Sequence, residues 1–251
     1  QPALAITDTG NLFCALEFSE KAIEKGLQPI IGCQMAVDFG DDGPDRRRPG
    51  GLPSALPSVV LIAATAEGFA NLTVLMSRSF LESEPGAPAN LPIGRFEGLT
   101  GGIIALTGGP GGPVDKAISA GLMPQAENRL ALLEELFGDR LYVELQRHGT
   151  PEEVMVEPHL VEFAYARGLP LVATNECYFP TRADYEAHDA LIAISEGRMV
   201  AEDDRRRLTE EHYFKSRAEM QTLFADLPEA LENTIEIARR CTVRAPKRKP
   251  L

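Results

Sequence analysis

The segment from residue 2 to residue 37 reads PALAITDTGNLFCALEFSEKAIEKGLQPIIGCQMAV. Its two ends, residues 2–7 (PALAIT) and 29–37 (PIIGCQMAV), are short apolar runs typical of buried strands. Between them, small and apolar residues recur at helical spacing: Leu12, Ala15, Leu16, Ser19, Ala22 and Ile23. Gly26 follows, at a position where helix C-caps favour glycine. The segment therefore predicts a strand, a helix and a second strand, which is the repeating unit of an α/β sheet.

The same alternation continues along the chain. Further short apolar runs predict strands at residues 59–63 (VVLIA), 103–107 (IIALT), 141–145 (LYVEL) and 169–174 (LPLVAT). Helical stretches lie between them at residues 67–80, 113–122, 125–137 and 151–167. Because the runs are apolar throughout, as strands covered on both faces are, we predict a parallel α/β sheet. A distorted, TIM-like βα barrel is favoured over an open sheet because no dinucleotide-binding fingerprint follows the first strand.

The strand signal fades after Pro180, and helical stretches follow at residues 183–195, 216–224 and 228–240. We predict a barrel over residues 1–180, and a helical appendage with a linker over residues 181–251. Residues 40–57 and 82–92 mix charge with Gly and Pro, which indicates irregular surface loops.

The composition excludes several classes of protein. The chain has 251 residues, 44% of them hydrophobic, which suffices for a full core. Its apolar runs stay short of the roughly 20 residues that span a bilayer, so no membrane partner is expected. The four cysteines form no C-x-x-C pair, which favours a reducing compartment such as the cytoplasm. A net charge of −12 argues against a free-standing nucleic-acid binder, so contact with DNA would require other parts of a larger molecule.

A series of segments carries a family resemblance. In chain order they are residues 3–11 (ALAITDTGN), 29–33 (PIIGC), 71–75 (NLTVL), 144–149 (ELQRHG), 168–175 (GLPLVATN), 187–191 (AHDAL) and 233–241 (NTIEIARRC). The series resembles the N-terminal polymerase-and-histidinol-phosphatase (PHP) domain of bacterial DNA polymerase III α subunits. This resemblance implies a distorted barrel of about seven βα units. It also implies an H-x-H pair on a strand before Gln1, so we expect upstream sequence that supplies a seventh strand.

Active members of this family resemble metal-dependent phosphoesterases, in which His, Asp and Glu at strand ends hold divalent ions. Carried onto this chain, the family's T-D-H turn has Thr9 in place of its His, and the G-x-E motif has Gln34 in place of its Glu. Ser58 replaces a further His, and Gly109 replaces the Cys of an S-G-C turn. In the family's T-N-D-x-H motif, the last position is Tyr178.

The resemblance therefore predicts a degenerate site without catalytic residues, a tightly bound metal cluster or another cofactor. The vestigial positions are Asp8, Thr9, Gln34, Ser58, Gly109, Glu176 and Tyr178. Only Asp8 and Glu176, which replaces the Asp of T-N-D-x-H, remain as hard ligands, with Cys177 as a weak third. Two carboxylates can hold no more than a weakly bound, hydrated Mg²⁺. We expect Asp8, Gln34, His148 and Glu176 to lie at one rim of the barrel.

Simpler roles are available for several polar residues. Asp8 precedes a helix, where its carboxylate can cap backbone N–H groups. His148 is interpreted as a hydrogen-bonded structural residue, and His212 carries no signal of its own. For the pair His188-Asp189 a packing or hydrogen-bonding role is favoured. The glycine-rich residues 108–113 lack the Lys-Ser or Lys-Thr of a phosphate-binding loop, so we interpret them as a turn at the barrel mouth.

The resemblance implies that the parent subunit synthesises DNA with Mg²⁺ held by a palm domain beyond Leu251. For this chain we predict a structural platform that docks the separate proofreading exonuclease subunit. The alternative is a metal-dependent 3′–5′ exonuclease that proofreads within the same subunit. A stand-alone phosphatase is disfavoured, because residues 233–241 resemble the polymerase subunit in particular.

Overall fold

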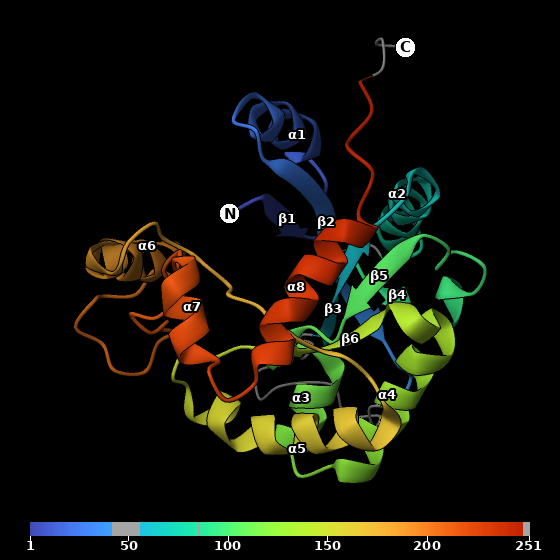
Figure 1. Cartoon of the computed structure of the whole chain (residues 1–251). Helices are drawn as coiled ribbons and strands as arrows, with labels where there is room; N and C mark the ends of the chain where they lie inside the picture. Colours follow the sequence, from blue (N-terminus) through green and yellow to red (C-terminus); the bar gives the residue numbers. More distant parts are fainter. Residues whose placement is uncertain (42–55, 85, 248–251) are drawn as a thin grey trace.

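A computed structural model describes residues 1–41, 56–84 and 86–247 of the chain (Figure 1). The strands are β1 (Ala3–Thr9), β2 (Gln28–Asp38), β3 (Ser58–Ala63), β4 (Leu91–Pro92), β5 (Ile103–Leu106), β6 (Leu141–Leu145) and β7 (Leu171–Ala173). The helices are α1 (Ala15–Glu24), α2 (Ala66–Leu81), α3 (Pro113–Ser119), α4 (Met123–Phe137), α5 (Pro151–Arg167), α6 (Tyr185–Glu196), α7 (Arg217–Leu223) and α8 (Pro228–Arg240). Every strand and helix predicted from the sequence is present in this set.

The strands form one curled, barrel-like sheet in the order β1-β2-β3-β5-β6-β7, and the short β4 pairs with β2. This confirms the predicted α/β fold, with one correction to the parallel arrangement. β3 runs antiparallel to both of its neighbours, β2 and β5, whereas β1–β2, β5–β6 and β6–β7 are parallel. A strand buried on both faces is apolar in either direction, so its sequence does not encode the direction in which it runs.

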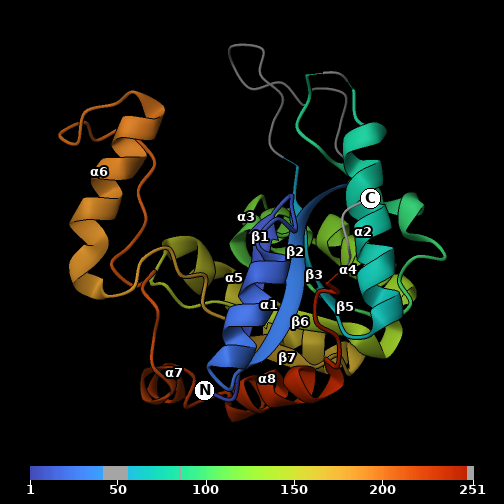
Figure 2. The same cartoon turned by 90° about the horizontal axis from the view of Figure 1, so that it is seen from above.

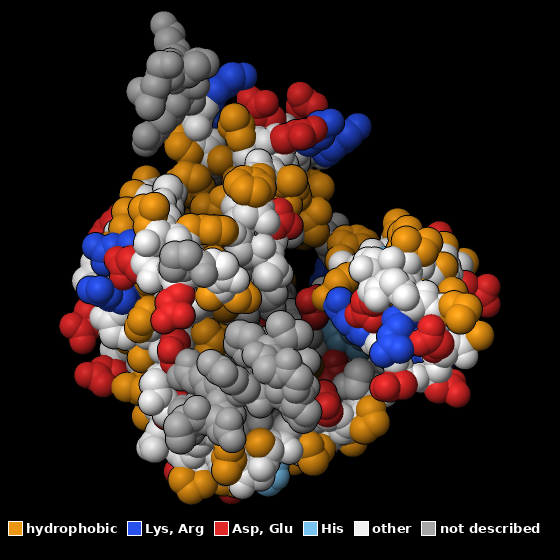
Figure 3. Space-filling view, turned by 180° about the vertical axis from the view of Figure 1, so that it is seen from behind, with side chains coloured by type: hydrophobic (Ala, Val, Ile, Leu, Met, Phe, Trp, Pro, Cys, Tyr) orange, Lys and Arg blue, Asp and Glu red, His pale blue; other side chains and the backbone are white. Residues whose placement is uncertain are grey.

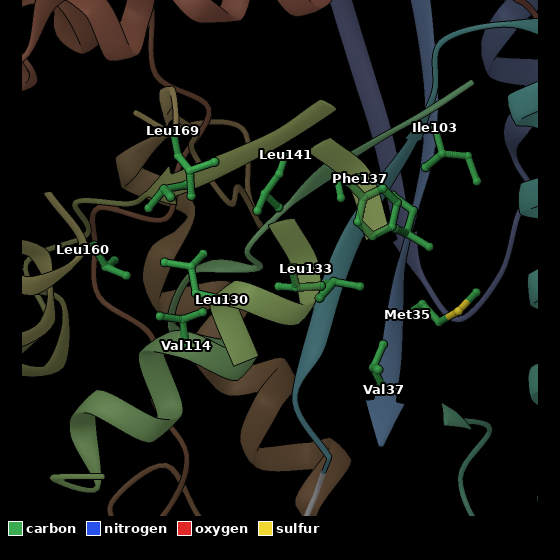
Figure 4. Close-up of a cluster of buried hydrophobic side chains, with 14 of the residues drawn as sticks. Met35, Val37, Ile103, Val114, Leu130, Leu133, Phe137, Leu141, Leu160 and Leu169 are labelled. Atoms are coloured by element: carbon green, nitrogen blue, oxygen red, sulfur yellow. The ribbon is translucent and has the colours of Figure 1, made fainter. Parts of the chain in front are cut away.

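The main core lies between one face of the sheet and helices α2 to α5. Figure 4 shows part of it, where Leu130 and Leu133 of α4 lie near Leu141 of β6 and Val114 of α3. All four side chains are fully buried. A second cluster covers the other face of the sheet, where strand residues meet Ile237 and Cys241 at the end of α8. Both faces of the central strands are therefore covered, as their apolar sequences predicted.

Local signals explain where several helices begin and end. Thr150 caps α5 by accepting a hydrogen bond from the backbone N–H of Glu153, and Glu153 completes a capping box. Gly168, at φ +67°, ends the same helix in the left-handed conformation. The bounds of α5, α8 and β6 agree with the sequence prediction. Helix α3 ends at Ser119, earlier than predicted, and the two-residue β4 lies within residues that we expected to be irregular.

The helices after residue 180 differ in their position relative to the sheet. Helix α8 packs against β7 and reaches the other end of the sheet, where the Gln28 side chain donates to the backbone oxygens of Ala238 and Cys241. By contrast, α6 lies away from the barrel in both views (Figures 1 and 2). The boundary at residue 180 stays a prediction. Most of the expected loop at residues 40–57 lies outside the described residues, as do residues 248–251 at the end of the predicted linker. Across the described residues, the helices are too short or too polar to cross a membrane.

Two isoleucines of α8 offer a matched test of its packing. Ile237 is 5% exposed in the second core cluster, whereas Ile235 on the same helix is 45% exposed. We expect Ile237→Ala to lower the free energy of unfolding by about 2–4 kcal/mol, because it leaves a cavity under α8. Ile235→Ala should change it by less than about 1 kcal/mol. Urea unfolding measures both values, and equal effects would contradict the packing of α8 on the sheet.

Candidate functional site

The ends of β1 and β2 bring Thr9 and Gln34, two of the predicted rim positions, together. Thr9 is the last residue of β1 and lies opposite Gln34 of β2 in the parallel ladder. The Thr9 hydroxyl donates a 2.9 Å hydrogen bond to Oε1 of Gln34. Asp8 lies one pair earlier, opposite Cys33. The prediction that Asp8 caps the following helix is wrong, because α1 has Cys14 as its N-cap residue and lacks a side-chain cap.

Ser58 and Gly109 lie close to this edge because β3 is antiparallel. Ser58 begins β3 and pairs with Ala36 of β2. A Cβ atom at Gly108, whose φ is +94°, would lie 2.0 Å from the backbone oxygen of Ser58, so the loop after β5 passes directly over the start of β3. A Cβ atom at Gly109 would lie 2.8 Å from Cδ of Gln146. The side chain of Gln146 thus takes up the space beside the position where the family has a cysteine.

A buried carboxyl group, which the sequence reasoning passed over, organises the neighbouring strand ends. Glu144 of β6 is 3% exposed. Its Oε1 accepts hydrogen bonds from the Thr174 hydroxyl (2.5 Å) and from Nε2 of Gln146 (3.3 Å), and its Oε2 accepts one from the Gly108 N–H (3.0 Å). Burial raises the pKa of Glu144 more than these hydrogen bonds lower it, and the charge of Glu176 raises it further. The sequence signal for this buried group is a charged residue inside the otherwise apolar run at residues 141–145 (LYVEL).

A second buried carboxyl group lies close by, on α3. Asp115 is 5% exposed, and its Oδ2 lacks a hydrogen-bond partner among the described residues. Burial raises the pKa of Asp115 well above its usual range, and Glu144 and Glu153 add to the effect. Asp115 therefore favours the protonated, neutral form, as isolated buried carboxyl groups do.

Glu176 and Tyr178 follow β7 and hydrogen-bond to each other. The Tyr178 hydroxyl donates to Oε1 of Glu176 at 2.8 Å. Burial, together with the charge of Glu176, raises the pKa of Tyr178 to about 12, so the phenol stays protonated. Tyr178 also stands beside two imidazoles, with ring centroids 5.9 Å from His212 and 5.6 Å from His188.

His148 is buried in a polar cluster at the turn between β6 and α5. Its Nδ1 lies 2.7 Å from Oε1 of Glu153, and its backbone N–H donates to Oε2 of the same carboxylate. Burial by itself would raise the pKa of Glu153, but the hydrogen bonds and charge of His148 outweigh it and lower that pKa. His148 is therefore a hydrogen-bonded residue, as the sequence interpretation held.

The aromatic ring that stacks on His148 could not be identified from the sequence. The ring of His212 stacks on that of His148 with centroids 4.0 Å apart and an interplanar angle of 12°. The Thr209 hydroxyl also donates to the backbone oxygen of His148. More than sixty residues separate the two histidines in the chain, so local sequence gives no sign of the contact. For the pair His188-Asp189, the predicted packing or hydrogen-bonding role is supported at Asp189. Its carboxylate forms an ion pair with Arg205, and both side chains are largely buried.

The structure thus brings Thr9, Gln34, Ser58 and Gly109 to one edge, and it places Tyr178, which hydrogen-bonds to Glu176, beside His212. Wherever the structure describes the chain, it contains no group of three or more His, Cys, Asp or Glu side chains arranged to hold a metal ion.

Comparison with known proteins identifies the family. The family model described as the PHP domain matches residues 1–148, which is more than half of the chain. This chain belongs to the PHP domain family. Curated relatives extend the match beyond the PHP model. DNA polymerase III subunit alpha of Caulobacter vibrioides is 45% identical over 100% of this chain and 21% of its own length. Its Escherichia coli K12 counterpart is 36% identical over 96% of this chain, and that of Rickettsia bellii is 35% identical over 99%; each match covers 20% of the relative.

This PHP chain therefore spans about a fifth of the length of the curated relatives that it matches. The match includes residues 181–251, which lie after the stretch covered by the family model. The segment with α6 and α8 therefore lies within the region aligned with the polymerase subunits.

The buried histidine pair of the PHP chain predicts a specific pH dependence. Burial lowers the pKa of His212 to about 4, and the neighbouring His148 contributes in the same direction. An unfolded histidine titrates near pH 6.5, so between about pH 6.5 and pH 4 the unfolded state binds more protons than the folded state. The contribution of His212 to stability is therefore fully present above this window and falls as the pH drops through it.

We expect His212→Gln to remove this contribution to the pH dependence. The loss of unfolding free energy between pH 7 and pH 4.5 should be smaller than in the wild type by roughly 1–3 kcal/mol. Urea titrations at the two pH values measure the difference. His159→Gln, on α5 and outside the pair, controls for the loss of a histidine elsewhere. An identical pH dependence in wild type and His212→Gln would show that the stacked pair does not hold His212 neutral.

Proposed function

We propose that this chain acts within a replicative DNA polymerase III α subunit, and that its PHP barrel is a non-catalytic platform for the proofreading exonuclease subunit. Support for the first part comes from relatives of that name, which align with the whole chain at up to 45% identity. Because the chain covers about a fifth of those relatives, DNA synthesis is assigned to the parent subunit and not to these residues. Its cellular location is then the cytoplasm.

The pairing of Thr9 with Gln34 is the observation that carries the non-catalytic role. In active family members these positions would hold metal through an imidazole and a carboxylate, whereas here a hydroxyl donates to a neutral amide. Neither group is a good ligand for a divalent ion at a multi-metal site. The neighbouring Glu144 is likewise occupied by hydrogen bonds from Gly108, Gln146 and Thr174. These hydrogen bonds engage Thr9, Gln34 and Glu144 with neighbouring groups, which favours stability over metal binding at these side chains.

The remaining carboxylates fit a weak cation site at most. Asp8 and Glu176 are the hard ligands left among the vestigial positions, and Glu176 already accepts a hydrogen bond from Tyr178. Two carboxylates leave most of the coordination sphere of Mg²⁺ to water. We therefore assign no cofactor to this chain and place the catalytic Mg²⁺ in the polymerase domain of the parent subunit.

A platform role explains why a barrel without its metal ligands is kept. A proofreading subunit must act near the primer end, and tethering it to the polymerase raises its effective concentration to the order of millimolar. The overall charge of −12 fits a surface that binds protein and leaves the DNA to other domains. The family resemblance suggests the exonuclease as the partner, and residues 181–251 would continue toward the palm domain.

Direct binding tests the platform. We expect the 251-residue chain to bind the cognate exonuclease subunit with a dissociation constant in the micromolar range or below, as measured by titration calorimetry. The full-length α subunit serves as the positive control. If the full-length subunit binds and this chain shows no heat of binding at tens of micromolar, docking belongs to another domain.

Metal content tests the loss of catalysis. We expect elemental analysis to find less than about one tightly held Zn or Mn per full-length subunit, because the donors needed for a cluster are replaced. Thr9→His should restore neither metal content nor hydrolysis of bis-p-nitrophenyl phosphate, since Gln34, Ser58 and Tyr178 still lack the family's ligands. Two or three bound ions in the wild type, with metal-dependent release of nitrophenol, would instead favour the exonuclease alternative.

A further inference from the structure

A small pocket between α3 and the first turn of α5 contains a buried carboxyl group. Asp115 of α3 is 5% exposed, and among the described residues its Oδ2 has no hydrogen-bond partner. The pocket has room for about one water molecule. It is lined by Pro110, Asp115, Ser119, Glu152, Glu153 and Val156. A buried oxygen without a partner, beside a space of this size, is the usual setting of an ordered internal water.

The surroundings of Asp115 favour its neutral form. Burial is the largest cause that raises the pKa of Asp115, and the charges of Glu144 on β6 and Glu153 on α5 raise it further. An ionised Asp115 would therefore be buried next to two like charges. The protonated acid avoids this repulsion, and it also has an O–H group that can donate a hydrogen bond.

Basic side chains on the helices around the pocket are engaged with other groups. Arg129 of α4 forms an ion pair with Asp41 at 2.7 Å, and it also donates to a backbone oxygen at the start of α3. Lys116 of α3 donates to the backbone oxygen of Leu56. The charges that act on Asp115 are thus those of its acidic neighbours, which favours a neutral ligand that can accept its proton in a hydrogen bond.

The lining of the pocket suits a water molecule better than a metal ion. Glu153 already accepts three hydrogen bonds, from Nδ1 and the backbone N–H of His148 and from the backbone N–H of Thr150. Of the roughly four lone-pair directions of its carboxylate, about one is left for a further donor. Glu152 is exposed to solvent. A Mg²⁺ or Ca²⁺ ion takes about six or more oxygen ligands, whereas an internal water needs only about two to four hydrogen-bond partners.

We propose that the pocket between α3 and α5 binds one ordered water molecule, which accepts a hydrogen bond from the protonated carboxyl group of Asp115 and donates one to Glu153. The water connects α3 to the first turn of α5, where Glu153 also holds His148. The site takes up one proton when the chain folds. It is independent of the proposed role in a polymerase subunit.

The bound proton gives the site a signature in solution. The pKa of Asp115 is raised in the folded state from an ordinary value of 3.8, so the stability that this group contributes is fully present below that value. It is lost as the pH rises toward the folded-state pKa, because the unfolded chain releases the proton first. Asp115→Asn keeps an N–H donor for the water but binds no proton.

Urea unfolding of the 251-residue chain at two pH values measures this linkage. We expect the unfolding equilibrium constant of the wild type, divided by that of Asp115→Asn, to rise about five- to tenfold from pH 5 to pH 6. The contribution of His212 is common to both proteins and cancels in the ratio. Figure 3 shows acidic and basic side chains intermixed on the lobe of α6 and the residues after it, a segment in which Asp204 is exposed. Asp204→Asn is therefore the matched control, and its ratio should change by less than about twofold.

A crystal structure of the same chain at about 1.5 Å resolution identifies the occupant. In crystals at pH 6 soaked with Mn²⁺, we expect a water peak about 2.6–3.2 Å from Oδ2 of Asp115, without anomalous signal from manganese in the pocket. Asp115→Asn should retain the water. Asp115→Leu should lose it, because an apolar side chain offers the water no hydrogen bond.

Each result decides the question. A ratio that stays constant from pH 5 to pH 6 shows that Asp115 is ionised in the folded state, and it overturns the inference. An anomalous manganese peak reassigns the pocket to a cation, and a pocket without density rules out the water. If Asp115→Asn does not fold, carbon-13 NMR of the Asp115 carboxyl group in the wild type replaces it. A titration midpoint above about pH 5 supports the inference, and one below about pH 4 overturns it.

Discussion

Coverage of the central strands on both faces is the constraint on which the rest of this structure depends. The large core cluster fills one side of the sheet, and the smaller cluster with Ile237 and Cys241 of α8 fills the other. Polar groups are costly between these layers, so they collect at the strand ends, where loops can supply hydrogen-bond partners. Glu144 is an exception, because its carboxyl group is buried near the end of β6. It accepts hydrogen bonds from Gly108, Gln146 and Thr174, which follow β5, β6 and β7.

The same strand ends are where a barrel enzyme carries its chemistry, and here they have a different character. Thr9 bonds to Gln34, Tyr178 bonds to Glu176, and His148 bonds to the carboxylate that also caps α5. A group that is satisfied by its neighbour loses that hydrogen bond when it binds a ligand, so mutual pairing of this kind stabilises the fold. In the proposed non-catalytic role, such hydrogen bonds would let the barrel keep its shape after its metal ligands are replaced.

The His148–His212 stack joins two parts of the chain that lie 64 residues apart in the sequence. His148 belongs to the turn after β6, and His212 belongs to the segment that returns from α6 toward α7. The hydrogen bond from Thr209 to the backbone oxygen of His148 strengthens the same connection. The segment that follows α6 is therefore anchored to the turn between β6 and α5.

The sequence by itself determined the number, order and type of the main elements, because apolar runs and helical periodicity report directly which residues must be buried. Through the family resemblance, motif positions also supplied the prediction that metal ligands are replaced at Thr9, Gln34 and Tyr178. Only the tertiary structure decided the direction of β3, since a strand buried on both faces has the same pattern either way. The roles of Glu144 and His212 also had to come from the fold. Gly108 and Thr174 lie 36 and 30 residues from Glu144, and His148 lies 64 residues from His212; contacts over such separations depend on strand order and not on local propensity.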